Sequence, residues 1–227
     1  MKLILPQMQI FYPKIEQKSE LILISGGREP NFEWFKKINK NRPIYCVDHG
    51  IDFCKKFNIL PDFLIGDFDS AAENSINWSI ANGVKIERHP VDKDFTDTQL
   101  ALDKINDKNF VIITGAFGGR FDHLYSTIFT CANSKIKNCL IDESEAILFI
   151  NGNESVDIEF FKKPFALSLL PMNEICEKVT INGVHWKLKN ANLKMSIPNA
   201  ISNRVDESKV TISIENGILA IYMYFSI

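Results

Sequence analysis

Short apolar runs alternate with amphipathic stretches through the first two-thirds of the chain, and this alternation restricts the possible folds more than any other feature. The apolar runs cover residues 21–25, 44–48, 63–65, 84–86, 111–114 and 139–141. Stretches with apolar residues at helical spacing follow the first five runs, at 32–38, 53–57, 76–81, 97–105 and 121–132. This alternation predicts βαβ units and a mainly parallel sheet, whose carboxyl edge is the usual place for a ligand.

The pattern changes after about residue 147, where alternating and β-branched segments appear and no helical pattern continues. Asn-Gly pairs at 151–152, 182–183 and 216–217 separate these segments, as is typical of hairpin turns. We therefore predict two domains. The first is an α/β domain over residues 1–145, whose first 20 residues match no pattern, and the second is an all-β domain over residues 146–227.

Composition argues against several classes of protein. The chain has 26 Lys plus Arg against 28 Asp plus Glu, and this net charge of −2 lacks the surplus that nucleic-acid or polybasic membrane binding requires. Its five cysteines include no C-x-x-C pair, and no apolar run approaches the roughly 18 residues of a membrane span. We predict a cytoplasmic protein with reduced thiols and with no nucleic-acid or membrane partner.

Carboxylates follow several of the predicted strands. Asp67 and Asp69 come directly after the run 63–65, and their i, i+2 spacing would project them to one side if the backbone stayed extended. Carboxylate oxygens of this kind suit Mg²⁺, which binds one or two carboxylates together with substrate phosphates. Asp48 ends the run 44–48, where it is equally explained as a helix N-cap. Asp97 opens the helix that Thr96 is placed to cap, and Lys93 lies just ahead of it among further aspartates.

Two glycine-arginine segments follow two other strands. Gly26-Gly27-Arg28 comes after the first run, and Gly118-Gly119-Arg120 lies between the run 111–114 and the helix that carries Asp122. Glycines let backbone N–H groups approach a phosphate and arginine adds a bidentate donor, although a plain strand-to-helix turn explains the first segment alone. Together with the carboxylates, these loops predict Mg²⁺-dependent phosphoryl chemistry and leave the acceptor open.

Three motifs carry a family resemblance. GDFDS (66–70), HPVDKDFTD (89–97) and GAFGGRFDH (115–123), in this order and spacing, resemble the thiamine pyrophosphokinase (thiamine diphosphokinase) family. The resemblance extends from about Leu21 to the C-terminus and includes GVHWKL (183–188) and Ser202-Asn203 in the all-β part. The family usually reads Asp-Gly-Gly-Ala where this chain has Asp48-His49-Gly50-Ile51, so nucleotide contacts there are expected to differ.

The resemblance implies a fold and an activity. The expected fold is an α/β catalytic, ATP-binding domain with helices on both faces of its sheet, followed by a thiamine-binding β-sandwich, in a homodimer that shares its pocket across the interface. The expected reaction transfers a pyrophosphoryl group from ATP to the thiamine hydroxyl with Mg²⁺, which gives AMP and thiamine diphosphate.

The resemblance also implies residue roles. Asp67, Asp69 and Asp97 would surround the metal, while Arg120 and Asp122 would lie at the phosphates and the reacting hydroxyl. Either Asp97 or Asp122 would accept the hydroxyl proton. The ATP site would comprise Gly26, Gly27, Arg28, Asp48, Lys93, Thr96, Gly118, Gly119 and Arg120. The thiamine pocket would include Trp186, Ser202 and Asn203, although a strand aromatic such as Trp186 is also common in a β core.

Two other functions remain open on the sequence alone. The same chemistry could act on another hydroxymethyl acceptor such as a pterin. Alternatively, the chain could be a nucleotide- or thiamine-binding module without catalysis, for which His49 in the nucleotide loop gives a slight reason.

Overall fold

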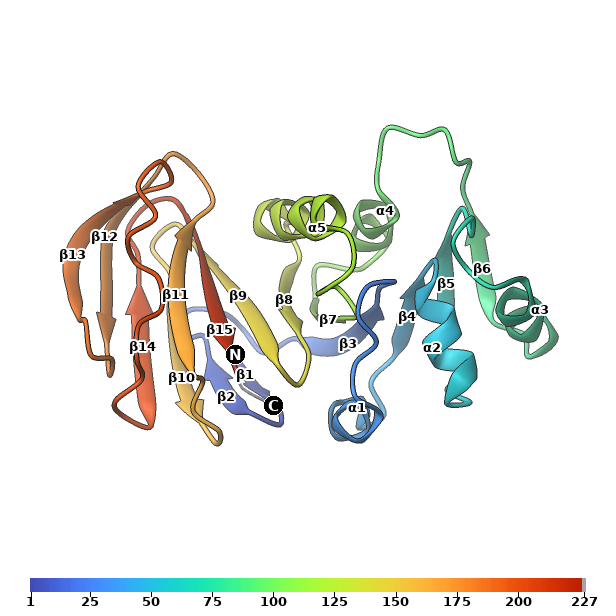
Figure 1. Cartoon of the computed structure of the whole chain (residues 1–227), viewed down its shortest axis with the longest axis horizontal. Helices are drawn as coiled ribbons and strands as arrows, with labels where there is room; N and C mark the ends of the chain where they lie inside the picture. The colour runs from blue at the N-terminus through green and yellow to red at the C-terminus, as the bar shows by residue number, and fades with distance from the viewer. Residues whose placement is uncertain (226–227) are drawn as a thin grey trace. The chain divides into compact units, whose positions relative to one another are not determined.

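The computed structural model describes residues 1–225 and divides into two compact units, of which the first covers Ser19–Asp142. This α/β unit is built on six strands that pair only in parallel (Figure 1). In spatial order they are β8 (Lys137–Ile141), β7 (Asn109–Thr114), β3 (Ser19–Ile24), β4 (Ile44–Val47), β5 (Phe63–Gly66) and β6 (Lys85–Arg88). The predicted parallel sheet is confirmed.

Five helices connect these strands. They are α1 (Phe32–Asn39), α2 (Gly50–Lys56), α3 (Glu73–Ala81), α4 (Asp97–Asp103) and α5 (Phe121–Asn133). Local capping explains where two of them begin. The Asn31 side chain accepts a hydrogen bond from the N–H of Trp34, and Thr96 forms a reciprocal capping box with Gln99 ahead of α4.

The helix α5 differs from a simple amphipathic helix. Phe121, Tyr125 and Phe129 lie along one face as predicted, with tilted rings whose successive centroids are 6.0 and 4.6 Å apart. Phe121 is nevertheless 77% exposed and Tyr125 53% exposed, while the fully buried positions of the helix are Cys131 and Ala132. The aromatic face is therefore not the face that packs on the core of this unit.

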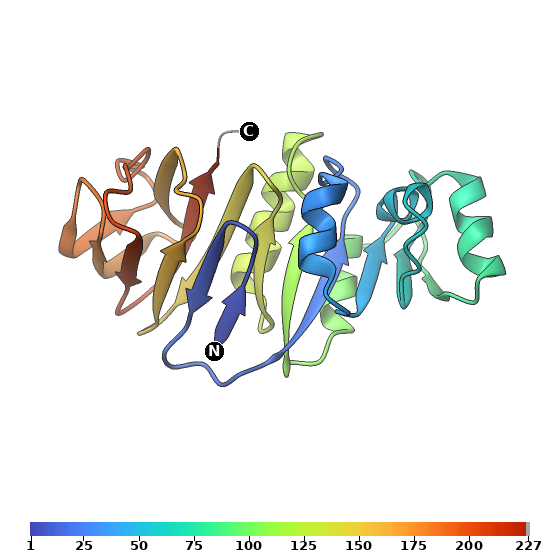
Figure 2. The same cartoon turned by 90° about the horizontal axis from the view of Figure 1, so that it is seen from below.

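The second unit joins residues 1–18 to the segment that begins at Glu143, and it is built from strands (Figure 2). One sheet has the order β1 (Lys2–Ile4), β2 (Met8–Phe11), β10 (Ser155–Phe160), β14 (Lys209–Ser213), β12 (Ile175–Asn182) and β13 (Leu188–Lys194). Three further strands pair antiparallel in the order β11 (Ala166–Pro171), β15 (Ile218–Tyr224) and β9 (Glu145–Asn151). Between residues 147 and 225 the structure has no helix, in agreement with the sequence.

The first residues of the chain are placed differently from the prediction. We expected them as an unassigned extension of the α/β domain, but β2 pairs antiparallel with β10, with Ile10 opposite Ile158. Leu3, Met8 and Ile10 are fully buried there, because alternate positions of β1 and β2 face the core of the β unit. Burial of this apolar surface holds residues 1–18 in the β unit.

Among residues 1–225, no helix is long and apolar enough to cross a membrane.

Candidate active site

Three carboxylates meet at the carboxyl edge of the parallel sheet. Asp48 follows β4, Asp67 follows β5 and Asp97 opens α4, and ligand oxygens of all three lie within 4.8 Å of one another. Each residue is partly buried. Strand ends of a parallel sheet collect on one edge, which explains how residues up to 49 positions apart in sequence (97 − 48) form one cluster.

Asp48 enters this cluster because residue 66 has no side chain. A Cβ at Gly66 would lie 1.7 Å from Asp48 Oδ1, so the carboxylate occupies the space that any other residue would fill. Asp48 itself has a φ of +43°, which turns it out of the strand line, and its Oδ1 accepts a hydrogen bond from the Phe68 N–H at 3.3 Å. Asp48 is not the N-cap of α2. His49 occupies that position, and its side chain forms no capping hydrogen bond.

Asp69 lies outside the three-carboxylate cluster. The i, i+2 argument required an extended backbone, but Phe68 between the two aspartates has a φ of +66°. The chain therefore turns, the Asp69 N–H donates to Asp67 Oδ1 at 3.1 Å, and the Asp69 side chain is exposed. The sequence spacing predicted that Asp69 lies with Asp67, whereas in the structure Asp48 is the residue that joins Asp67 and Asp97 in the cluster.

Lys93 neutralises part of the cluster. Its ammonium lies 2.6 Å from Asp67 Oδ2 and 3.2 Å from Asp97 Oδ2, with all three side chains largely shielded from solvent. Partial burial alone would raise the pKa of Asp67, but the hydrogen bonds from Lys93 and the Asp69 N–H outweigh it and lower that pKa. For Lys93, partial burial favours the neutral amine, yet its bonds to Asp67 and Asp97 raise its pKa overall.

The cluster retains uncompensated negative charge. Burial, followed by the charges of Asp97 and Asp67, raises the pKa of Asp48 to about 7. In addition, Asp97 Oδ1 is buried and forms no hydrogen bond within residues 1–225. Three converging carboxylates with one unpartnered buried oxygen fit a hard divalent cation such as Mg²⁺, so the donor set suits the ion that the sequence predicts.

The two glycine loops form one backbone platform beside this cluster. The N–H of Gly27 donates to the Gly115 carbonyl at 2.5 Å, and the N–H of Arg28 donates to the Phe117 carbonyl at 2.6 Å. A Cβ at Gly27 would lie 2.7 Å from each of those two oxygens, and a Cβ at Gly115 would lie 2.4 Å from the Ser25 carbonyl. Only glycine allows this approach, which places the predicted phosphate loops side by side.

Both predicted phosphate-binding arginines are held by carboxylates. Arg28 donates through Nε and Nη2 to Asp142 Oδ2 at 3.0 and 2.6 Å, and Asp142 is buried at the end of β8. Arg120 donates to both oxygens of Asp122 at 3.1 and 2.6 Å on the exposed start of α5. That pairing lowers the pKa of Asp122, which makes it a weaker proton acceptor. Gly118 and Gly119 are exposed beside it, with φ near +70°.

The predicted thiamine residues lie in the β unit. Trp186 is 61% exposed, so it is not a core aromatic. The backbone N–H of Trp186 donates to Asn203 Oδ1 at 3.1 Å, and Asn203 Nδ2 donates back to the backbone carbonyl of Trp186 at 2.8 Å. Both residues line a hollow of about 250 Å³, whereas Ser202 has a φ of +56° and donates its N–H to Ser168 Oγ. The other lining residues, which the sequence did not indicate, are Leu169, Leu188, Ala191, Asn192, Leu193, Asn199, Ala200 and Ile201.

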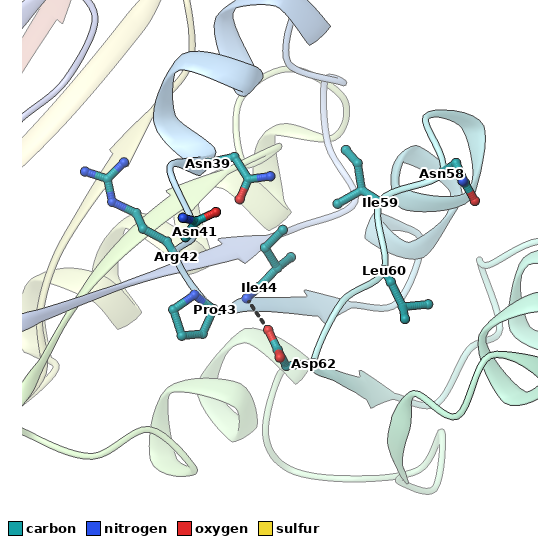
Figure 3. Close-up of a pocket in the computed structure, with 9 residues that line it drawn as sticks. All are labelled: Asn39, Asn41, Arg42, Pro43, Ile44, Asn58, Ile59, Leu60 and Asp62. Carbon is teal, nitrogen blue, oxygen red and sulfur yellow. Dashed lines mark hydrogen bonds between the residues drawn. The ribbon is translucent and has the colours of Figure 1, made fainter.

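A second hollow, of about 450 Å³, lies between the loops that precede β4 and β5 (Figure 3). It is therefore at the amino edge of the sheet, away from the strand ends that carry the carboxylates. Its only carboxylate, Asp62, accepts a hydrogen bond from the N–H of Ile44 at 2.8 Å. Asn41 and Asn58 have positive φ, which accounts for asparagine there without a ligand. The carboxyl edge is the better candidate for chemistry.

Comparison with known proteins agrees with this arrangement. A family model described as thiamin pyrophosphokinase, catalytic domain, matches residues 35–141, and one described as thiamin pyrophosphokinase, vitamin B1 binding domain, matches residues 155–219. Thiamine pyrophosphokinase of Bacillus subtilis is 30% identical over 178 residues, which cover 76% of this chain and 83% of that protein.

Solved structures share the fold. The crystal structure of thiamine pyrophosphokinase from Bacillus subtilis has a TM-score of 0.78 at 26% identity and covers 92% of this chain and all of that one. Yeast thiamin pyrophosphokinase, at 19% identity, has a TM-score of 0.75 over 93% of this chain and 88% of that one. With both family models matched along one chain, this protein belongs to the thiamin pyrophosphokinase family.

Proposed function

We propose that the protein is a thiamine diphosphokinase, which transfers a pyrophosphoryl group from ATP to the hydroxyl of thiamine. The observation that carries this proposal is the cluster of Asp48, Asp67 and Asp97 beside a glycine platform, in a chain that belongs to the thiamin pyrophosphokinase family. Thiamine as the acceptor is inferred from the names of the relatives, and phosphoryl transfer is inferred from the carboxylate cluster.

The reaction exchanges one bond for another. The thiamine hydroxyl oxygen forms a bond to the β-phosphorus, the bond from that phosphorus to the oxygen bridging to the α-phosphorus breaks, and AMP leaves. Mg²⁺, held by Asp48, Asp67 and Asp97, would supply positive charge to phosphate oxygens. Such a reaction asks the protein mainly for positioning and for charge neutralisation.

The chain's own residues would do the following. The exposed backbone of Gly118 and Gly119 binds phosphate oxygens, and Arg28 and Arg120 contribute while shared with Asp142 and Asp122. Asp97 accepts the hydroxyl proton, since pairing with Arg120 lowers the pKa of the alternative acceptor, Asp122. Lys93 offsets part of the charge of Asp67 and Asp97, with which it forms ion pairs. Asp69, which is exposed next to Asp67, remains a predicted metal ligand.

Thiamine would bind in the hollow beside Trp186 and Asn203. Its thiazolium ring carries a permanent positive charge and its aminopyrimidine ring is flat, so an exposed indole face suits both by cation–π attraction and stacking. Leu169 and Leu188 give this hollow an apolar side, and Asn203 gives it a polar one. The mixed lining supports a ligand that is partly aromatic and partly polar.

We extend the proposal to the finer features of the fold. Figure 1, in which α4 and α5 lie on one side of the parallel strands and α1 and α2 on the other, supports helices on both faces of that sheet. The alternating burial along β10 and β14 and the contact of Phe160 with Phe225 support a sandwich in the β unit. All five cysteines are unpaired, which supports a cytoplasmic location.

A homodimer with a shared pocket is also part of the proposal. The exposed aromatic face of α5 and the exposed Trp186 are apolar surfaces of the kind that interfaces bury. Mixing Asp97→Asn with Trp186→Ala protein, assayed at thiamine concentrations far below KM where both variants are poorly active, tests the shared pocket. If each site uses one residue from each protomer, random exchange restores about a quarter of normal activity. If each site lies within one protomer, mixing restores nothing.

The function itself is tested by incubating the purified protein with thiamine, ATP and Mg²⁺ and measuring AMP and thiamine diphosphate. We expect the two products in equal amounts, and both should disappear with EDTA. AMP without thiamine diphosphate would keep the proposed pyrophosphoryl transfer but refute thiamine as the acceptor. A hydroxymethyl-pterin would then be tested as the acceptor. Tight binding of Mg·ATP with neither product would point to a binding module instead.

A further inference from the structure

Arg88 emerges from the sheet next to the carboxylate cluster. It is the last residue of β6 and the register partner of Gly66 on β5, so its side chain leaves the sheet on the same face as a side chain at position 66 would. The Asp48 carboxylate lies on that face, over Gly66. The Cα of Arg88 is therefore one strand spacing, about 4.8 Å, from the position that Asp48 covers.

The guanidinium of Arg88 is held against a fixed ring. Its Cζ lies 5.1 Å from the centroid of Phe68, which is 5% exposed and stands between Asp67 and Asp69. A cation in this position is attracted to the ring face, and a buried ring has little freedom to move away. The interaction directs the arginine toward the acidic loop rather than along the surface.

Arg88 also differs from the other arginines in its charge balance. Arg28, Arg42, Arg120 and Arg204 each form an ion pair with a carboxylate. For Arg88, the part of the chain that the structure describes shows no carboxylate within 4.0 Å. At the carboxyl edge of the sheet, Lys93, Arg28 and Arg120 are thus already paired, and Arg88 keeps its full charge for a ligand.

We propose that Arg88 is a substrate-binding residue that contacts the phosphate chain of metal-bound ATP. The proposal rests on the proposed function, since it takes the Asp48–Asp67–Asp97 cluster as the place where ATP and its cation bind. The triphosphate carries several negative charges into a site that already holds three carboxylates. Its binding is therefore favoured by a cationic side chain that does not already form an ion pair within the protein. An arginine fork meets this need and can donate two parallel hydrogen bonds to one phosphate.

The test compares Arg88→Ala and Arg88→Lys with a matched control, Lys85→Ala. Lys85 begins the same strand, is exposed, and also places a cation on a ring, with Nζ 5.4 Å from the Phe63 centroid. It lies at the opposite end of β6, so its replacement removes a comparable cation–π contact far from the carboxylates. For each protein, the KM values for ATP and thiamine, the thermal midpoint, and Mg·ATP binding by calorimetry without thiamine would be measured.

We expect Arg88→Ala to weaken Mg·ATP binding and raise the KM for ATP by roughly 10- to 100-fold, the loss of one or two charge-assisted hydrogen bonds. The KM for thiamine should stay unchanged. Arg88→Lys should fall between Arg88→Ala and the unaltered protein, because it keeps the charge and loses the fork. Lys85→Ala should leave both KM values unchanged.

Other results would overturn the proposal. If Arg88→Ala lowers only the thermal midpoint, as far as Lys85→Ala does, Arg88 is a stabilising surface residue. If the unaltered protein makes no thiamine diphosphate but binds Mg·ATP, the proposed function fails, and calorimetry on the variants still decides the role of Arg88. If the unaltered protein does not bind Mg·ATP, both proposals fail.

Discussion

The Asp48 carboxylate occupies the space beside Gly66 where a side chain would otherwise lie: its Oδ1 is 1.7 Å from the position of a Cβ at residue 66. Residue 66 also has a φ of +151°, which side chains rarely allow. Asp48 can therefore join the cluster only while position 66 is glycine.

We predict that Gly66→Ala displaces Asp48 and lowers kcat/KM at least about 100-fold, since a shift of about 1 Å in a catalytic site has effects of this size. The altered backbone should also cost about 1–3 kcal/mol of unfolding free energy. Steady-state kinetics and urea denaturation would measure the two effects. Gly152→Ala is the control, because nothing lies within 4 Å of its Cβ and its φ is not positive. Full activity in Gly66→Ala would show that Asp48 is dispensable.

The orphaned oxygen of Asp97 leads to a second prediction. Asp97→Asn should reduce turnover more than 100-fold and raise the Mg²⁺ concentration needed for half-maximal rate, because an amide is a weaker ligand and no base. Stability in EDTA should not fall, since one of three crowded charges is removed. The exposed neighbour Asp94→Asn is the control and should behave like the unaltered protein. An unchanged Mg²⁺ dependence in Asp97→Asn would remove this residue from the metal site.

Asp48 should make stability depend on pH in metal-free protein. Burial, and then the charges of Asp97 and Asp67, raises its pKa from 3.8 to about 7, so between these values the folded state holds a proton that the unfolded chain has lost. The unfolding free energy should therefore fall as pH rises from about 4 through 7, with a slope from this group of at most about 1.4 kcal/mol per pH unit.

Urea denaturation at several pH values in EDTA would show this slope, and Asp48→Asn should reduce it because an amide does not titrate. Added Mg²⁺ should oppose the fall by favouring the ionised form. An equal slope in Asp48→Asn and the unaltered protein would assign the pH dependence to other groups.

Trp186 provides a prediction in the β unit. Trp186→Ala should raise the KM for thiamine roughly 10-fold, in line with a cation–π and stacking contribution of about 0.5–2 kcal/mol, and leave the KM for ATP unchanged. Phe165→Ala is the control, since Phe165 is also an exposed aromatic of the same unit, at 76% exposure, and does not line the hollow. Equal effects of the two substitutions would mean that the hollow is not the thiamine site.

The sequence predicted the α/β part well because its signals are local. Apolar runs ending in glycine or aspartate mark β3, β4, β5 and β7, and Thr96 with Gln99 marks the start of α4. Since parallel strands end on one edge, these boundaries placed Asp48, Asp67 and Asp97 at the same edge of the sheet, although the predicted metal ligands included Asp69 and not Asp48.

What the sequence missed depends on contacts and backbone angles that spacing does not encode. The positive φ of Phe68 breaks the extended backbone that the i, i+2 argument required and leaves Asp69 exposed, and no residue type at 68 indicates this turn. The buried pairing of Asp142 with Arg28 joins residues 114 positions apart. The hollow beside Trp186 takes Asn192 and Asn199 from a strand and a loop that carry no motif.

The pairing of β2 with β10 has a consequence for how the molecule is made. Residues 8–11 are synthesised roughly 145 residues before their partner strand at 155–160. The α/β unit, Ser19–Asp142, is complete before that strand exists. At the usual synthesis rate of about 5–20 residues per second, the apolar residues Leu3, Met8 and Ile10 wait for some 7–30 seconds without their sheet. During that interval β1 and β2 can pair only with each other, so their apolar face stays exposed until β10 has been made.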